Sequence, residues 1–261
     1  MNRKPWKTHL SVFLRAFSFL CLWPFTIQAT ETVKVGVTHF PPFYIVSDDN
    51  QVSGLGIDLI EALNQIQDDY RFTPIIASPR RRHQMFQDER FDMSFFDHLA
   101  WGWDKDQVDA TDVYLTGGEV FITQKAPGRD KSFFSNIQNR SIAAIRGYHY
   151  KFADYVTDPH ALKTKFNITL TNSQDHILKL VAENRVEIGI MTETYLLQYF
   201  QKNPAAKGQF LTAEQYDQVY NFRTILRKNT KPSANEMNKL MTALRKNANF
   251  NWLKEKYGID W

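Results

Sequence analysis

The chain has 261 residues, of which 43% are apolar and 23% are charged. This composition is ordinary for a globular fold, and the length allows one large domain or two small ones. The net charge of +4 comes from the first 29 residues, which contain four basic and no acidic residues. The remaining chain carries 28 residues of each sign, which argues against a nucleic-acid-binding surface.

The first 29 residues have the pattern of a secretory signal peptide. Four basic residues precede the apolar run AFSFLCLWPF, and Ala29 ends the segment. We therefore expect cleavage after Ala29 and a periplasmic destination. An uncleaved N-terminal anchor is the alternative, although the run is short for a membrane span and Pro24 interrupts it. The only cysteine, Cys21, lies in this segment, so the mature chain can form no internal disulfide.

Strands alternate with helices along the rest of the chain. Residues 32–37 alternate between apolar and polar, as a strand does, and residues 56–66 place their apolar residues on one helical face. We expect Arg80, Arg81 and Arg82 on the solvated face of a helix's first turns. The pattern predicts further strands over 71–77, 91–96, 118–125, 141–145, 168–171, 186–191 and 220–229, and helices over 79–87, 150–156, 173–185, 194–200 and 233–247. This alternation indicates an α/β fold with mainly parallel sheets.

The sequence shows no motif of a metal, nucleophile or phosphate site. The six histidines after the signal peptide have no metal-ligand spacing such as His-Glu-x-x-His, and neither Gly-x-Ser-x-Gly nor a Gly-rich phosphate loop occurs. We therefore expect no catalytic residues, no metal and no cofactor.

Several segments, in their order and spacing, resemble the bacterial extracellular solute-binding proteins of family 3, the polar amino acid-binding type. The segments are VKVGVTHFPPFYI, GLGIDLIEAL, FDMSFF, VDATDVYLTGGEVF, SIAAIRGYHY, NRVEIGIMTETYLL and LRKNANFNWLKEKYGID. The resemblance covers nearly all of the mature chain. It implies a clamp of the type II periplasmic-binding-protein kind, with two lobes that enclose a ligand in the cleft between them.

The resemblance also implies a domain organisation. Each lobe would be a small α/β unit with a mostly parallel sheet, and two strands would cross between the lobes near residues 124–125 and 220–221. Lobe 1 would then comprise residues 30–125 together with residues 221–261. Lobe 2 would comprise residues 126–220.

Aromatic residues of lobe 1 are the first candidates for the cleft. Phe40 lies where the family has an aromatic residue that stacks on the ligand, shortly before Phe43 in a Pro-Phe pair. The alternative is a loop aromatic residue that packs on its own lobe. Trp101 and Trp103 flank a glycine in the segment that corresponds to the family's ligand loop. We expect one of the two to face the cleft and the other to pack against the lobe.

Acidic residues in the same loop depart from the family. Residues 92–112 align without gaps, so that Asp97 takes the place of a small residue and Asp104 takes the place of the arginine that pairs with the ligand's α-carboxylate. One carboxylate cannot clamp another, because like charges repel strongly in a dry cleft. The resemblance therefore implies a ligand other than an ordinary α-amino acid, such as one with a cationic group held by Asp97, Asp104 and the tryptophan faces.

Lobe 2 contributes the remaining candidates. Arg146 ends a predicted strand and could supply the missing cation, or it could form a surface ion pair. Tyr148 and His149 replace two hydroxyl residues that contact the ligand in the family. Thr192 occupies the position of the family's aspartate for the ligand's amino group, and Glu193 would take that role after a shift of one residue. The alternative for Thr192 and Glu193 is helix capping.

These observations predict a monomeric periplasmic protein that binds a small polar solute. It would deliver the solute to an ABC-type membrane permease or to a sensor kinase and perform no chemistry. The alternative is an enzyme similar to periplasmic cyclohexadienyl dehydratases, in which Glu193 or His149 would act as general acid or base.

Overall fold

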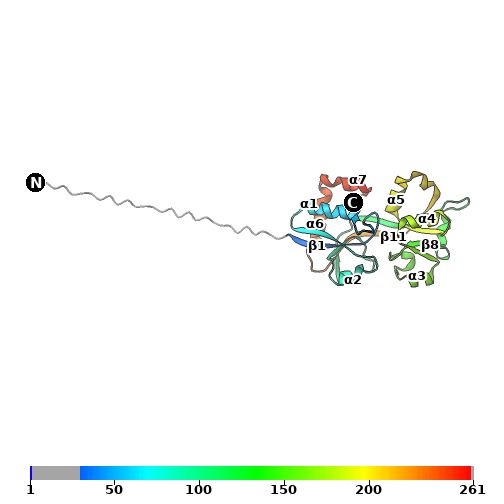
Figure 1. The fold of residues 1–261 in the computed structure, drawn as a ribbon, viewed down its shortest axis with the longest axis horizontal. Coiled ribbons are helices and arrows are strands. Elements are labelled where there is room, and N and C mark those ends of the chain that lie inside the picture. The colour runs from blue at the N-terminus through cyan, green and yellow to red at the C-terminus, as the bar shows by residue number, and fades with distance from the viewer. Residues whose placement is uncertain (2–29, 260–261) are drawn as a thin grey trace.

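A computed structural model of the protein describes Met1 and residues 30–259. Apart from Met1, the predicted signal peptide over residues 1–29 lies outside the described residues. Within residues 30–259, no helix is long and apolar enough to cross a membrane. Two lobes lie side by side and are joined by strands (Figure 1).

The first lobe is built on a sheet in the order β4–β1–β5–β11. Strand β1 (Glu31–Val37) pairs in parallel with β4 (Tyr70–Ile76) and β5 (Met93–Asp97). Strand β11 (Phe210–Arg227) runs antiparallel to β5 and to the short β6 (Val108–Ala110). Because β1 and β5 run in the same direction, their carboxyl ends meet at the edge that faces the second lobe.

Helices pack on both faces of this sheet. α1 (Leu55–Ile66), α6 (Ala234–Lys246) and α7 (Asn251–Tyr257) bury their apolar residues in the larger core. α2 (Arg82–Gln87) contributes Phe86 to a smaller core on the other face. The remaining elements of this lobe are β2 (Ile45–Val46), β3 (Val52–Ser53) and the 3₁₀ turn η4 (Ala248–Phe250).

The second lobe continues the sheet in the order β11–β7–β10–β8–β9. Strand β8 (Ile142–Ile145) pairs in parallel with β9 (Ile168–Thr171) and β10 (Ile188–Thr192), whereas β7 (Leu115–Gln124) is antiparallel to β10. The helical elements are α3 (Pro159–Lys165), α4 (Gln174–Ala182), α5 (Glu193–Lys202), η1 (Lys131–Asn139), η2 (Lys151–Ala153) and η3 (Pro204–Gln209). The predicted α/β fold, in which two crossing strands join two lobes, is confirmed. Each lobe has a parallel part, β4–β1–β5 in the first and β10–β8–β9 in the second, and the antiparallel strands β7 and β11 join the two parts into one sheet.

Strands β7 and β11 are the two that cross between the lobes. They pair antiparallel from Leu115 opposite Phe222 to Gln124 opposite Phe210. Leu115 packs in the core of the first lobe, whereas β7 already pairs with β10 from Glu119 onward. Residues 119–122 of β7 therefore belong to the sheet of the second lobe, because they pair with β10.

The crossing strands approach each other closely at Gly118. A Cβ atom at this position would lie 2.8 Å from the carbonyl oxygen of Gln218 and 2.4 Å from the Tyr216 ring. Any side chain here would force the two strands apart, so glycine allows the ladder to continue from one lobe into the other.

Two local predictions differ from the structure. The helix expected over 150–156 is a single turn, η2, because Asp154 and Tyr155 adopt left-handed backbone conformations with φ of 52° and 60°. The helix begins later instead, where the Asp158 side chain accepts a hydrogen bond from the Ala161 amide and Pro159 opens α3. The strand expected over 220–229 is the second half of β11.

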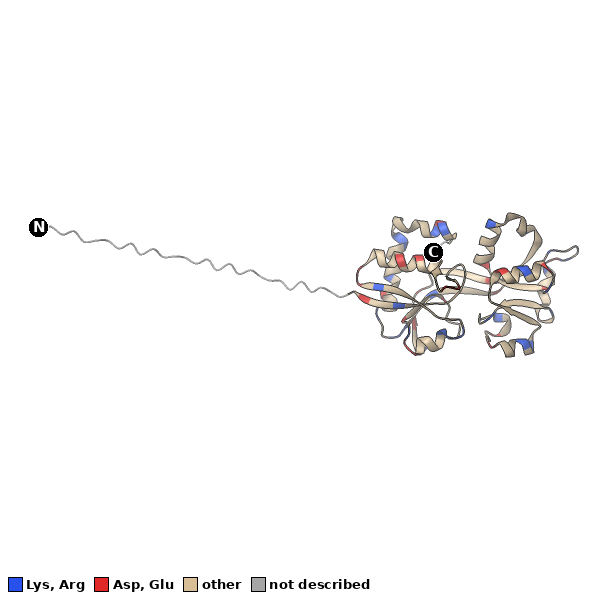
Figure 2. Ribbon diagram, in the orientation of Figure 1, with Lys and Arg blue, Asp and Glu red and all other residues tan. Residues whose placement is uncertain are grey.

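Charged residues of both signs occur in both lobes (Figure 2). This distribution agrees with the balanced charge of residues 30–261 and leaves neither lobe with a single sign of charge.

Replacement of Leu63 tests the core of the first lobe. Leu63 in α1 is fully buried, whereas Gln65 in the same helix is exposed. Leu63→Ala should lower the free energy of unfolding by about 2–5 kcal/mol, because it removes buried methyl groups and leaves a cavity. Gln65→Ala should change it by less than about 0.5 kcal/mol. Urea denaturation followed by circular dichroism measures both, and equal effects would contradict the packing.

Candidate functional site

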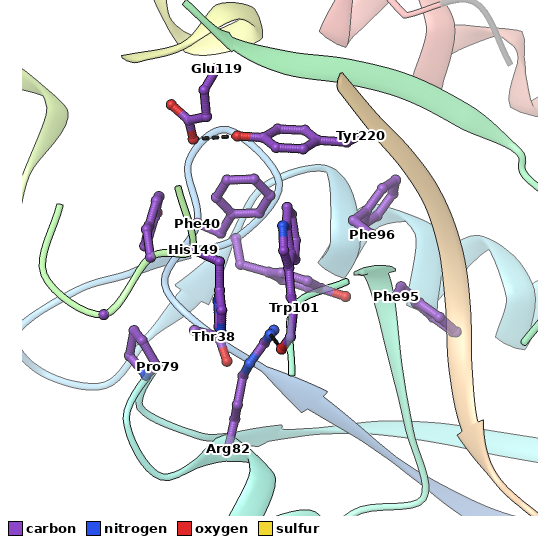
Figure 3. Close-up of a pocket in the computed structure, with 13 residues that line it drawn as sticks. Thr38, Phe40, Pro79, Arg82, Phe95, Phe96, Trp101, Glu119, His149 and Tyr220 are labelled. Atoms are coloured by element: carbon purple, nitrogen blue, oxygen red, sulfur yellow. Dashed lines mark hydrogen bonds between the residues drawn. The ribbon is translucent and has the colours of Figure 1, made fainter. Parts of the chain in front are cut away.

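A pocket lies between the lobes, at the place where the strands cross (Figure 3). It encloses about 50 Å³. Both lobes and both crossing strands contribute to its lining. The lining residues are Thr38, Phe40, Tyr44, Pro79, Arg82, Phe95, Phe96, Trp101, Glu119, Gly147, Tyr148, His149 and Tyr220.

The two lobes touch across this pocket. The Tyr148 hydroxyl of the second lobe donates a hydrogen bond to the carbonyl oxygen of His39 in the first, at 3.1 Å. Gly147 has a φ of 82°, and a Cβ atom there would come within 3.1 Å of the Pro79 side chain. A larger residue at this position would therefore hold the lobes apart. The structure is a closed form of the clamp.

Gln218 on β11 connects both walls of the pocket. Its side-chain oxygen accepts a hydrogen bond from the Trp101 indole at 3.1 Å, and its amide donates to the backbone oxygen of His149. The Trp101 and His149 rings are nearly parallel, at an interplanar angle of 14° and a centroid distance of 6.5 Å. One residue of a crossing strand thus fixes an aromatic ring of each lobe.

Phe40 is at the centre of the aromatic lining. Its ring centroid lies 5.4 Å from Tyr148, 5.8 Å from Trp101 and 6.2 Å from Tyr220, in T-shaped arrangements. The structure therefore places four of the predicted residues, Phe40, Trp101, Tyr148 and His149, on the pocket wall. Tyr220, which was predicted only as a crossing position, lies there too.

Two of the predicted aromatic residues lie elsewhere. Phe43 is 1% exposed and packs in the core of the first lobe, where its ring lies 4.8 Å from Phe222. Trp103 packs under α2, with its ring 5.0 Å from Phe86. Of the two tryptophans, Trp101 thus faces the cleft and Trp103 packs against the lobe.

Asp97 does not line the pocket but holds a residue that does. Its carboxylate accepts hydrogen bonds from Arg82 Nη1 at 3.0 Å, Ser94 Oγ at 2.9 Å and Trp103 Nε1 at 2.8 Å. Arg82 Nη2 donates to the Trp101 carbonyl at 3.0 Å. The expectation that Arg82 lies on a solvated face is wrong, since Arg82 is 9% exposed and pairs with a buried carboxylate.

The other charged candidates stay outside the pocket. Asp104 is exposed in a turn, where its carboxylate accepts a hydrogen bond from the Asp106 amide at 2.9 Å. Arg146 reaches the carbonyl oxygen of Leu170 at 3.5 Å within the second lobe. The guanidinium in the pocket belongs to Arg82 at the start of α2, because the Arg146 side chain turns toward β9 while the residues after it line the pocket.

Glu119 is a buried acid that the sequence analysis did not select. It lies on β7 and is 1% exposed. Its Oε1 accepts hydrogen bonds from the Tyr220 hydroxyl and, at 3.2 Å, from the Thr192 hydroxyl. Burial raises the pKa of Glu119 from 4.5 to about 8, opposed by the bond from Tyr220 and reinforced by nearby Asp217. The sequence signal was an acid inside an otherwise apolar strand.

Thr192 and Glu193 both fall at the start of α5, with different surroundings. Thr192 is buried and lies behind Glu119, where its hydroxyl also accepts a hydrogen bond from Gln174 at 2.9 Å. Its side chain makes no capping bond to α5. Glu193 lies outside the pocket lining and accepts a hydrogen bond from the Tyr216 hydroxyl.

His149 is uncharged at neutral pH. Burial, with the charges of Arg82 and His83 nearby, lowers its pKa to about 3. The charged groups at the pocket are therefore Arg82 and its partner Asp97, whereas the carboxyl group of Glu119 holds its proton at neutral pH. Among residues 30–259, no cluster of three or more His, Cys, Asp or Glu residues could hold a metal ion.

Residues 33–260 match the sequence profile of the bacterial extracellular solute-binding proteins, family 3. The chain therefore belongs to this family. No curated protein sequence matches the chain.

Solved structures share the fold. The substrate-binding protein of an ABC uptake transporter from Streptococcus pneumoniae, with bound histidine, is 15% identical, with a TM-score of 0.67 over 87% of this chain and 92% of that one. A histidine kinase sensor domain similar to periplasmic binding proteins is 12% identical, with a TM-score of 0.65 over 88% and 98%. An ancestral arginine-binding protein bound to arginine is 18% identical, with a TM-score of 0.63 over 88% and 99%. At these identities the likeness establishes the fold alone.

Replacement of Asp97 tests its pairing with Arg82. Asp97→Asn should lower the free energy of unfolding by about 3 kcal/mol, because it leaves a buried guanidinium without its counter-charge. The control is Asp104→Asn, which removes a carboxylate from the same loop at an exposed site and should change the free energy by less than about 0.5 kcal/mol. Urea denaturation at pH 7 compares them, and an Asp97→Asn effect as small as that of the control would refute the buried pair.

The raised pKa of Glu119 predicts a pH dependence of stability. The folded state holds this proton more tightly than the unfolded state, so the stabilisation is fully present below pH 4.5 and is lost as the pH rises to about 8. Between pH 5 and 8, the free energy of unfolding should fall by roughly 1 kcal/mol per pH unit relative to Glu119→Gln. Urea denaturation of both proteins at several pH values measures the difference. Parallel profiles would show that Glu119 has an ordinary pKa.

Proposed function

We propose that this protein is a periplasmic solute-binding protein that captures a small polar ligand between its lobes. It would deliver the ligand to an ABC-type permease or to a sensor kinase, acting as a monomer and by binding alone. The observation that carries the proposal is the pocket between the lobes, to which both lobes and both crossing strands contribute aromatic and charged side chains. Closure of such a clamp buries the ligand and removes it from water.

The size of the pocket supports a small ligand. In the closed form it encloses about 50 Å³, whereas one water-sized group needs about 10–15 Å³ by the same measure. A ligand of only a few non-hydrogen atoms fits without further opening. A larger one would enter when the lobes separate by bending of β7 and β11.

The charge arrangement supports a ligand other than an ordinary α-amino acid. Arg82 is already paired with Asp97 at 3.0 Å. A ligand carboxylate at Arg82 would bring a second negative charge close to Asp97 in a pocket with little water, where like charges repel strongly. Asp104 is exposed and takes no part in this repulsion. A ligand without a carboxylate would distinguish this protein from the neighbours solved with histidine and arginine.

The dehydratase-like alternative receives little support from the geometry. It gave the role of general acid or base to Glu193 or His149. Glu193 lies outside the pocket lining. The low pKa of His149, about 3, makes its ring a weak base at neutral pH.

Removal of the Trp101 ring tests the proposed site. The purified protein is freed of bound ligand by unfolding and refolding, and its melting temperature is measured against a panel of small metabolites. At least one should raise it, because a ligand that binds only the folded state stabilises by about 2.7 kcal/mol at 100 times its dissociation constant. Trp101→Ala should abolish the shift, whereas Trp252→Ala, which removes an exposed ring from α7, should keep it.

Native mass spectrometry of freshly purified protein identifies any ligand that it carries. The proposed function fails if no ligand is found and no member of the panel changes the melting temperature. The proposed ligand class fails if common α-amino acids give the largest shift.

A further inference from the structure

One buried carboxyl group in the pocket has an oxygen without a hydrogen-bond partner. Glu119 Oε1 accepts from Tyr220 and Thr192, whereas Oε2 has no partner among the described residues. The Tyr44 hydroxyl, also in the lining, is likewise buried and unpaired. A buried polar atom without a partner costs free energy, and native proteins rarely leave one. Oε2 therefore marks the place where a ligand's positive or donor group would bind.

The surroundings of this oxygen favour a particular kind of positive group. The aromatic rings of Phe40, Trp101, Tyr148 and Tyr220 line the same small pocket as Glu119. Aromatic faces attract organic cations but replace little of the hydration of a metal ion or a primary ammonium group, which needs several oxygen acceptors. An alkylated ammonium makes few hydrogen bonds and presents methyl or methylene groups that pack against rings.

The charges of the pocket allow one positive charge on the ligand and no carboxylate. Arg82 and Asp97 balance each other at 3.0 Å. His149 is neutral, because its pKa is lowered to about 3. An ionised Glu119 is then the only unbalanced charge among the described residues of the lining, and a single cation neutralises it.

We propose that the pocket takes a small alkylammonium cation, with its positive end on Glu119 of crossing strand β7 and its alkyl groups against the aromatic lining. The inference rests on the proposed solute-binding function and names the ligand class for that same site.

Binding of such a cation is coupled to a proton. The polar and titratable groups that face Glu119 are Tyr220 and Asp217 on β11, Thr192 on β10, and Tyr148 and Tyr150 after β8. None of these groups is a cation, so without a ligand Glu119 keeps its proton at neutral pH, with a pKa of about 8. A bound cation favours the carboxylate, which releases the proton to solvent. Affinity should therefore rise with pH and level off above pH 8.

Three probes that differ in charge test the inference by isothermal titration calorimetry. Choline carries the cation, 3,3-dimethyl-1-butanol replaces its nitrogen by carbon, and glycine betaine adds a carboxylate. Ligand-free protein should bind choline at least about tenfold more tightly than either of the others. Tetramethylammonium should bind as well. If neither cation binds more tightly than the neutral alcohol, the inference is wrong.

A matched pair of variants assigns the effect to Glu119. Glu119→Gln should weaken choline binding at least about tenfold and remove its pH dependence. Asp104→Asn removes an exposed acid outside the pocket and should bind choline as the unmodified protein does. In the unmodified protein, choline affinity should rise by up to about tenfold per unit between pH 6 and 8, with proton release seen as a buffer-dependent heat. Equal binding by Glu119→Gln overturns the proposal.

Three further outcomes can be distinguished. If Glu119→Gln does not fold, as judged by circular dichroism, the probe comparison and the pH dependence of the unmodified protein still decide. If the protein binds another solute from the panel but neither cation, the proposed function stands and the inference fails. If no solute binds at all, both fail.

Discussion

The antiparallel ladder between β7 and β11 is the interaction on which the rest of the molecule depends. It extends from the core of the first lobe to that of the second, so the same two strands form part of the sheet in each lobe. The ladder also carries Glu119, Gln218 and Tyr220 to the middle of the cleft. These side chains belong to neither lobe alone. The register of β11 is irregular on either side of Tyr216, close to the point where Gly118 lies against this strand.

Two buried acids at the pocket, Asp97 and Glu119, differ in how completely their oxygens are hydrogen-bonded. Asp97 is matched by Arg82 and by hydrogen bonds to both of its oxygens, so it serves to position the arginine and the tryptophan loop. Glu119 has hydrogen bonds to one oxygen only, and within residues 30–259 no positive group pairs with its carboxyl group. A fully hydrogen-bonded buried group stabilises one arrangement, whereas a buried oxygen without a partner carries a cost in free energy. In the proposed site, a ligand would supply the partner that Glu119 Oε2 lacks.

Local patterns sufficed for much of the fold, because hydrophobic periodicity depends on neighbours in sequence. The strands over 141–145, 168–171 and 186–191 correspond to β8, β9 and β10. The resemblance to the family placed Phe40 and the tryptophan loop near a cleft, but it could not separate Trp101 from Trp103, since both flank the same glycine. It was wrong for Arg82, which follows two exposed arginines in the same run. Alignment with the family's loop also gave Asp104 a role that its exposed turn does not allow.

By itself the sequence determined the α/β alternation and the aromatic turn around Trp101, because each depends on residues close together along the chain. It also determined the family, because the order and spacing of short segments along the chain carry that resemblance. The tertiary structure alone decided which charges meet in the cleft. Arg82 and Asp97 are 15 positions apart, and Glu119 and Tyr220 are 101 positions apart. Their pairing depends on how α2 turns toward β5 and on the register of two crossing strands. These contacts form only when the whole sheet assembles, so hydrophobic periodicity along the chain does not predict them.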